Sequence, residues 1–310
     1  MENSNNYDSA EVLSKLLTFP GIKVNRQKSL ADIFKDQPTS MLTTILEAGP
    51  VKAGLDRDLL RRKAMQLLAK RRLESSAFSF LAGLPGGVVG IGVGLTADTV
   101  QYFAFALRLA QEIAYIYGVE DFWDDGVVDD EAVQSRLLLY LGVMFGISGA
   151  SAALHLVSAS LAKQAMKKLP QKALTKTFYY PIVKSIAKAL GKQMTKGIFA
   201  KGVAKAIPVA GGIFSGGITY ATMKPMGLRL INSLDESLFD YTEEEIEADI
   251  IEVEAIVRDA EEDEDSLSKT EVNHGDQLHK AVDLYMAGII TNEEFETIKK
   301  RVMQQATEGE

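Results

Sequence analysis

Cysteine is absent from this chain of 310 residues. Its absence excludes a disulfide framework and a thiolate metal site, and it favours a reducing cytoplasm as the compartment. Several catalytic and binding motifs are missing as well: there is no HExxH, no GxSxG, and no Gly-Lys-Ser/Thr after a glycine-rich turn. We therefore expect no metal and no cofactor. The segment MENSNNYDSA at the start has neither a basic stretch nor an apolar run, so we expect no secretory signal.

Acidic residues are missing from the middle of the chain. Residues 132–234 contain neither Asp nor Glu but carry 14 Lys or Arg, so a positive centre lies between acidic flanks, although the whole chain has a formal net charge of −8. Many of these lysines recur at every fourth position, which places them on one face of a helix. The candidates for a lipid-facing surface are Lys184, Lys188, Lys192, Lys196, Lys201 and Lys205.

Three interpretations of this cationic surface stay open. The first is an ordinary solvated face that the acidic segment 243–265 neutralises within the chain. The second is a docking face for an anionic membrane, to which each basic residue near the surface contributes about 1 kcal/mol. The third is a nucleic-acid surface, which the scarcity of arginine and the lack of interleaved aromatic residues disfavour.

Charge is also missing from three long apolar runs, residues 75–97, 137–162 and 206–223. The second run holds His155, which we expect to be a packing residue. The first two exceed the roughly 20 residues that a bilayer-spanning helix needs, but their many small residues favour buried core helices or interfacial insertion over integral spanning. Glycines at four-residue spacing allow close helix packing, in a soluble core or in lipid. These glycines are Gly86, Gly90, Gly94, Gly142, Gly146, Gly212 and Gly216.

The periodicity of the apolar residues predicts an all-α protein: a multi-helix bundle with glycine-rich helix-turn-helix segments and a small C-terminal helical hairpin. We divide the chain into an N-terminal extension with short helices (1–50), a helical domain (51–240), an acidic helix with a linker (241–274) and the hairpin (275–305). Expected helices span residues 30–36 after a cap at Ser29, 41–49 after a cap at Thr39 or Ser40, 55–82, 97–118, about 132–168 and 182–206, and a further helix ends near 238. Pro181 is expected to precede the helix 182–206.

A polar site on the helix after the first glycine-rich turn is the best candidate for catalysis. Asp98 is the only charged residue between Glu74 and Arg108. The helix dipole stabilises a carboxylate in the first turn by about 0.3–1 kcal/mol, which explains Asp98 without any chemistry. Alternatively, Asp98, Arg108 and Gln111 contribute to a buried polar site, beside an i,i+4 pair of Arg108 with Glu112.

Two blocks of the sequence resemble the EcsC family of bacterial proteins. They are AGLPGGVVGIGVGLTADTVQYFAFALRLAQEIAYIYG and AKGVAKAIPVAGGIFSGGITYATMKPMGLRLINSL, within a resemblance that covers roughly residues 55–240. The family-like positions are Gly83, Pro85, Gly86, Asp98, Gln111, Tyr115, Tyr117, Gly118, Lys205, Pro208, Gly211, Gly212 and Gly217. The activity of this family is not established, so the resemblance implies a bacterial, membrane-proximal setting and no mechanism.

The C-terminal segment resembles a SHOCT module, a short helical hairpin with the pattern Gly-x-Ile-Thr-x-x-Glu-Phe. The matching residues are Gly288, Ile290, Thr291, Glu294 and Phe295. Thr291 and Glu294 also form a capping box, which predicts the start of the second helix. The resemblance implies oligomerisation or partner contacts through this hairpin, and so short a unit buries too little surface to be very stable alone.

These features together predict a non-catalytic bacterial protein on the cytoplasmic face of the plasma membrane. Its lysines would meet anionic lipid, its glycine-rich apolar helices could insert, and the acidic segment 241–265 would shield the lysines when lipid is absent. Two alternatives stay open. One is a hydrolase-like enzyme with a polar site around Asp98 and Arg108, and the other is a pore-forming, toxin-like effector that uses the glycine-spaced helices.

Overall fold

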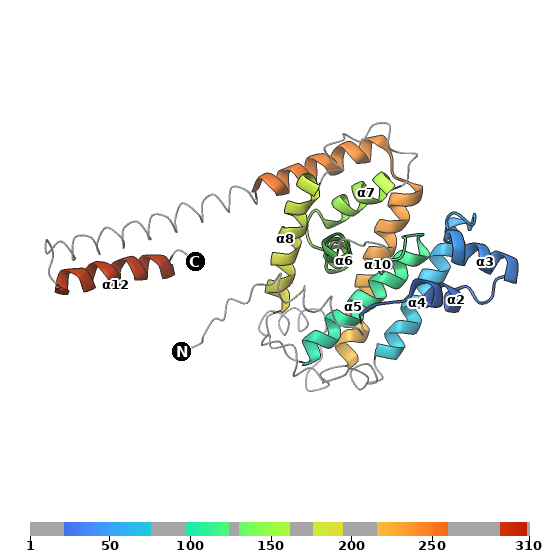
Figure 1. Cartoon of the computed structure of the whole chain (residues 1–310), viewed down its shortest axis with the longest axis horizontal. Helices are drawn as coiled ribbons and strands as arrows, with labels where there is room; N and C mark the ends of the chain where they lie inside the picture. The colour runs from blue at the N-terminus through green and yellow to red at the C-terminus, as the bar shows by residue number, and fades with distance from the viewer. Residues whose placement is uncertain are drawn as a thin grey trace. The chain divides into compact units, whose positions relative to one another are not determined.

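The structure is a computed structural model that describes residues 22–75, 97–123, 130–161, 176–194, 216–259 and 292–308. Every regular element in these ranges is a helix, which confirms the predicted all-α class (Figure 1). The helices are α2 (Arg26–Ile33), α3 (Thr39–Ala48), α4 (Arg57–Ser75), α5 (Ala97–Ile116), α6 (Asp130–Phe145), α7 (Ala150–Leu161), α8 (Lys176–Met194), α10 (Gly216–Phe239), a helix over residues 243–259, and α12 (Asn292–Glu308). The chain divides into two compact units, Met1–Glu254 and Ala255–Glu310, and α12 belongs to the second.

α6 is the central helix of the first unit, and Figure 1 shows it end-on among its neighbours. It contacts α5, α7, α8 and α10. Leu137 and Leu141 lie on one side of α6, Leu139 and Val143 lie on the other, and all four are at most 1% exposed. A helix that is apolar on all sides belongs in a core, so other helices enclose the part of the uncharged run that lies in α6. None of the described helices combines the length and the apolar character that crossing a bilayer requires.

The single helix predicted over residues 132–168 is wrong, because the chain turns between α6 and α7. Gly146 and Gly149 have φ values of 69° and 73°, in the left-handed region that side chains other than glycine rarely adopt. Ile147 closes the end of α6 by donating its backbone N–H to the carbonyl of Gly142. Gly146 therefore ends a helix, whereas Gly142 packs inside one, against side chains of α7 and α8.

Other helix starts differ from the prediction as well. α3 begins at Thr39 and Pro38 occupies its N-cap position, so neither Thr39 nor Ser40 is the cap. Asn25, not Ser29, caps α2, because its extended backbone lets the side-chain oxygen accept from the backbone N–H of Lys28. Ser29 lies buried inside α2. α8 begins at Lys176 and contains Pro181, which costs only the hydrogen bond to the carbonyl of Thr177 near the start of the helix.

α10 and α4 pack closely at Gly227. A Cβ atom added at Gly227 would lie 2.5 Å from Cδ1 of Leu68 and 2.9 Å from its Cδ2. Leu68 is 2% exposed, so its side chain has little room to move. The glycine therefore permits the close approach of two helices that also carry a buried charged cluster.

We expect Gly227→Ala to lower the free energy of unfolding by about 1–2 kcal/mol, because overpacking against Leu68 outweighs the gain in helix propensity. Urea unfolding followed by circular dichroism measures this loss. Leu68→Ala in the same chain should relieve the overlap, so the double variant should lose less stability than the two single losses added together. Equal stability of Gly227→Ala and the wild type would contradict the close contact.

Candidate functional site

The catalytic candidates Asp98 and Arg108 both lie on α5 but are separated along it. Asp98 is in the first turn, and the placement of its side chain lies outside the described residues. Arg108 follows ten residues later, a rise of about 15 Å, so its side chain does not reach Asp98 directly. The Arg108 side chain is half-buried, and this burial lowers the pKa of its guanidinium from the ordinary value.

Gln111, the third candidate, is fully buried and holds the N-terminal segment against α5. Its Oε1 accepts from the backbone N–H of Val24 at 3.1 Å and from Nε1 of Trp123 at 2.7 Å. Its Nε2 donates to the carbonyls of Ile22 at 2.8 Å and Leu107 at 3.0 Å. All four hydrogen-bonding positions of the amide are therefore used within the protein, which gives Gln111 a structural role.

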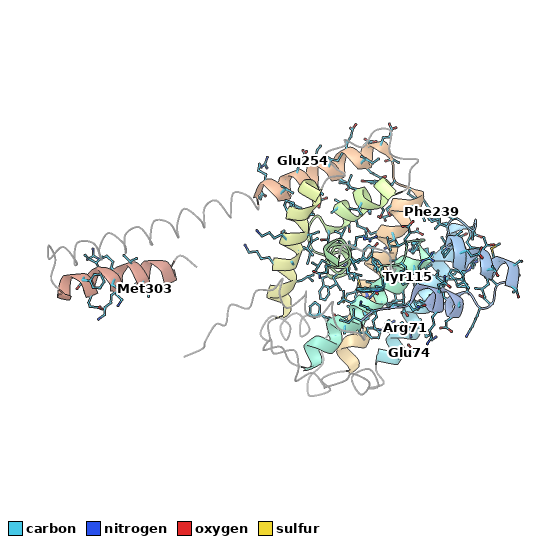
Figure 2. All side chains as sticks on the ribbon, viewed as in Figure 1. Arg71, Glu74, Tyr115, Phe239, Glu254 and Met303 are labelled. Atoms are coloured by element: carbon cyan, nitrogen blue, oxygen red, sulfur yellow. The ribbon has the colours of Figure 1, made fainter. Side chains whose placement is uncertain are left out.

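The carboxylate of Glu112 on α5 forms a bidentate ion pair with Arg71. Arg71 of α4 donates from Nε to Oε2 at 2.7 Å and from Nη2 to Oε1 at 2.5 Å. Arg71 also pairs with Glu74, one turn along α4 (Figure 2). The hydrogen bonds with Glu112 are the largest cause that raises the pKa of Arg71. The i,i+4 spacing predicts Arg108 as the partner of Glu112 within α5, whereas nothing in the sequence indicates this bidentate contact from α4.

Asp235 of α10 is a buried carboxylate with three donors. Arg57 Nε lies 2.8 Å from Oδ2, Arg61 Nη1 lies 3.3 Å from the same oxygen, and Tyr117 donates its hydroxyl to Oδ1 at 3.2 Å. The Asp235 side chain is 2% exposed. Arg57 also forms a two-point contact with Asp240, just beyond the end of α10. The cluster joins α4, α5 and α10.

Lys63 and Lys70 of α4 also form ion pairs with carboxylates of the same unit. Lys63 lies 2.5 Å from Asp36, and Lys70 lies 2.9 Å from Asp32. These hydrogen bonds are the largest causes that lower the pKa values of the two aspartates. They tie α4 to α2 and to the turn that follows it, so much of the charge of α4 serves to join helices.

α8 differs from α4, because its apolar side is in the core and its two lysines with described side chains face outward. Ile182, Ile186 and Leu190 are completely buried, and α8 contacts α6 and α7. Lys184 and Lys188 are exposed on the opposite side. The predicted amphipathic, cationic helix is therefore present over the described length of α8.

Several other candidates fall outside the part of the chain that the structure describes. They are Lys196, Lys201, Lys205, Gly86, Gly90, Gly94, Gly212, Gly288, Ile290 and Thr291, together with the side chain of Lys192. Gly216 is the first residue of α10. Phe295 is half-buried on α12, and this helix begins at Asn292, directly after the cap predicted at Thr291.

His155 occupies a polar cluster that sequence analysis did not anticipate. Its Nδ1 lies 3.0 Å from Oδ2 of Asp249, and its Nε2 lies 3.0 Å from Oγ of Ser233. Because a carboxylate only accepts, Nδ1 carries a hydrogen, and in the neutral ring Nε2 accepts from the Ser233 hydroxyl. Tyr241 donates its hydroxyl to the same Asp249 oxygen at 2.9 Å. The expected packing histidine thus links α7, α10 and the helix over 243–259.

The order Ser233–His155–Asp249 resembles the hydrogen-bonded triad of serine hydrolases, but its surroundings oppose nucleophilic catalysis. Ser233 is 3% exposed and lies inside α10, where the backbone N–H groups serve the helix and cannot stabilise an oxyanion. It also lies near the C-terminal end of α10, which is the negative end of the helix dipole. Glu236, with Oε2 3.9 Å from His155 Nε2, adds further negative charge. The cluster is therefore a structural link between helices.

No group of three His, Asp or Glu side chains within the described ranges could hold a metal ion. A scan against family models gave no match, and searches of curated proteins and of solved structures gave none either. The resemblances to the EcsC and SHOCT families therefore stay predictions that rest on the sequence motifs.

Proposed function

We propose that this protein docks reversibly on anionic membranes through the outer face of α8. Lys184 and Lys188 form this face, and the four-residue spacing of the sequence continues it to Lys192 in the same helix. The observation that carries the proposal is that α8 exposes these lysines while it buries its apolar side against the core. A rigid helix therefore presents the cations outward together.

The distribution of acidic residues supports the proposal. α7 and α8 lie wholly within residues 132–234, so neither helix carries a carboxylate of its own. Each basic residue near an anionic bilayer contributes about 1 kcal/mol, within a Debye length of about 8 Å at physiological salt.

We also propose a location for the protein and a way in which several copies assemble. The cytoplasmic leaflet is where anionic lipid is concentrated, so the protein would lie there as a peripheral protein. Two or three lysines give only weak docking for one chain. A homo-oligomer formed through the C-terminal hairpin, with Gly288, Ile290, Thr291 and Phe295 at the contact, would strengthen the docking by multivalency.

We expect Lys184→Gln/Lys188→Gln to bind vesicles containing phosphatidylglycerol roughly 30-fold more weakly than the wild type, because two lysines contribute about 1 kcal/mol each. Co-sedimentation across a salt series measures the affinity. The matched control is Lys28→Gln/Lys35→Gln, which removes one exposed lysine in α2 and another just after it and should leave binding unchanged. Binding by the wild type that is indifferent to salt and to anionic lipid would reject the proposal.

Release of a dye trapped in the same vesicles separates docking from pore formation. Docking through α8 leaves the bilayer closed, so the dye should stay inside at protein concentrations that give full binding. Rapid release at those concentrations would instead support the pore-forming alternative.

A further inference from the structure

The acidic helix, which we define as residues 243–254, has few apolar contacts for its length. It carries seven carboxylates and no basic residue. Among its side chains only Ile246 and Val253 are buried and apolar, whereas Ile251 is 68% exposed. Glu254 lies on the outer surface (Figure 2). Two buried side chains in about three helical turns hold the helix weakly, so polar contacts decide whether it stays attached.

The start of the acidic helix stabilises the helix but not its attachment. Glu245 Oε2 accepts from the backbone N–H of Thr242 at 2.7 Å, and Thr242 Oγ1 accepts from the backbone N–H of Glu245 at 3.3 Å. This capping box satisfies N–H groups within the helix itself. It adds no bond to α7 or α10, so the attachment must come from elsewhere.

The cluster around His155 supplies that attachment, and we call it the histidine clamp: Ser233, His155, Asp249 and Tyr241. Asp249 lies on the buried side of the acidic helix and is 17% exposed. It receives one hydrogen bond from His155 and one from Tyr241, and Ser233 of α10 holds the other ring nitrogen of His155. The Tyr241 ring packs 5.3 Å from the imidazole, measured between centroids.

We infer that the histidine clamp holds the acidic helix in place and that the helix, so held, weakens docking of α8 on anionic membranes. This inference rests on the proposed function. α8 packs against α7, and the acidic helix is bound to α7 through His155. Six of the seven carboxylates of the acidic helix are exposed. The helix therefore adds negative surface charge to the unit that carries α8, and this charge opposes the approach of the unit to an anionic surface.

Opening of the clamp would remove this repulsion without changing the lysines. A freed acidic helix can move away from the membrane, because the anionic surface repels its carboxylates and its few apolar contacts do not hold it back. The acidic helix therefore opposes docking by electrostatic repulsion, and the clamp sets how strongly it does so.

Asp249→Ala in the full chain tests the inference. Hydrogen exchange of the backbone amides in residues 243–254 should become roughly tenfold faster. Binding to vesicles containing phosphatidylglycerol should become at least about fivefold tighter. Glu252→Ala is the matched control, because it removes an exposed carboxylate from the same helix without touching the clamp. It should leave exchange unchanged and alter binding by less than about twofold.

Tyr241→Phe keeps the test valid if Asp249→Ala does not fold, because it removes only one of the two bonds to Asp249. It should shift exchange and binding in the same directions by smaller factors. Unchanged exchange in both variants contradicts the clamp. Faster exchange without tighter binding contradicts the inference that the held acidic helix weakens docking, but it leaves the docking proposal standing. If neither the wild type nor any variant binds anionic vesicles, the docking proposal is contradicted, and so is the inference about the acidic helix.

Discussion

Asp235→Ala should lower the free energy of unfolding by about 3 kcal/mol, because it breaks a buried ionic cluster. The carboxylate is the common acceptor for Arg57, Arg61 and Tyr117. The two guanidiniums are partly exposed and recover water when the carboxylate is lost. The Tyr117 hydroxyl is buried with its ring, so it is left without its acceptor, at a cost of about 1–3 kcal/mol.

The protonation of the Tyr117 hydroxyl supports the predicted loss of stability in Asp235→Ala. Burial is the largest cause that raises the pKa of Tyr117 far above the ordinary value, and the negative charge of Asp235 raises it further. The hydroxyl is therefore protonated throughout the usual pH range and always acts as a donor to Asp235. Asp235→Asn keeps an acceptor for Tyr117 but turns a donor toward Arg57 and Arg61, so the conservative change should also destabilise the protein.

Urea unfolding of Asp235→Ala against Glu120→Ala measures the effect of burial. Glu120 also pairs with a cation, Lys52, at 3.9 Å, but its side chain is 85% exposed. An exposed pair of this kind contributes at most about 1 kcal/mol, so Glu120→Ala should change stability very little. Similar losses for the two variants would show that Asp235 acts as a surface charge and not as the centre of a buried cluster.

The fold was largely predictable where local signals decide the structure. The helix predicted over 97–118 corresponds to α5, and Gly118 follows it with a φ of 83°, as a C-terminal glycine should. The helix predicted to end near residue 238 corresponds to α10, which ends at Phe239. At the end of α5 the apolar period and the glycine that follows the helix indicate the same boundary.

Local signals failed where one residue type serves two purposes. Gly142 and Gly146 have the four-residue spacing of a packing motif, yet Gly142 packs inside α6 and Gly146 ends it with a positive φ. The spacing is the same in both cases, and only the tertiary structure decides between them. The missed turn followed from this ambiguity, and it changed one long apolar helix into the pair α6 and α7.

The charged contacts were beyond sequence analysis because their partners are far apart in the chain. Arg57 and Asp235 are separated by 178 residues, and His155 and Asp249 by 94. One signal was nevertheless present. Asp249 lies between Ile246 and Val253 on the side of its helix that is buried, and an acid on a buried side requires a donor. The histidine in the otherwise uncharged run was the available donor.

Gln111→Leu should lower the free energy of unfolding by about 3–4 kcal/mol, since it leaves buried groups without partners. The backbone N–H of Val24, the indole N–H of Trp123 and the carbonyl of Ile22 all lose the same amide. The loss should be concentrated at the N-terminal segment. Hydrogen exchange at residues 22–25 should therefore accelerate more than exchange in α10.

Urea unfolding of Gln111→Leu, with Gln66→Ala as the control, measures the stability. Gln66 is exposed on α4, and its replacement should change stability by less than about 0.5 kcal/mol. Gln111→Glu separates hydrogen bonding from volume, because it preserves size but replaces the donor that faces the carbonyls of Ile22 and Leu107. It should destabilise the protein at least as much as leucine does, since a carboxylate at this position is also buried. Full stability of Gln111→Glu would show that the amide donor is dispensable, and a role for Gln111 toward a substrate would then become the better explanation of its place on α5.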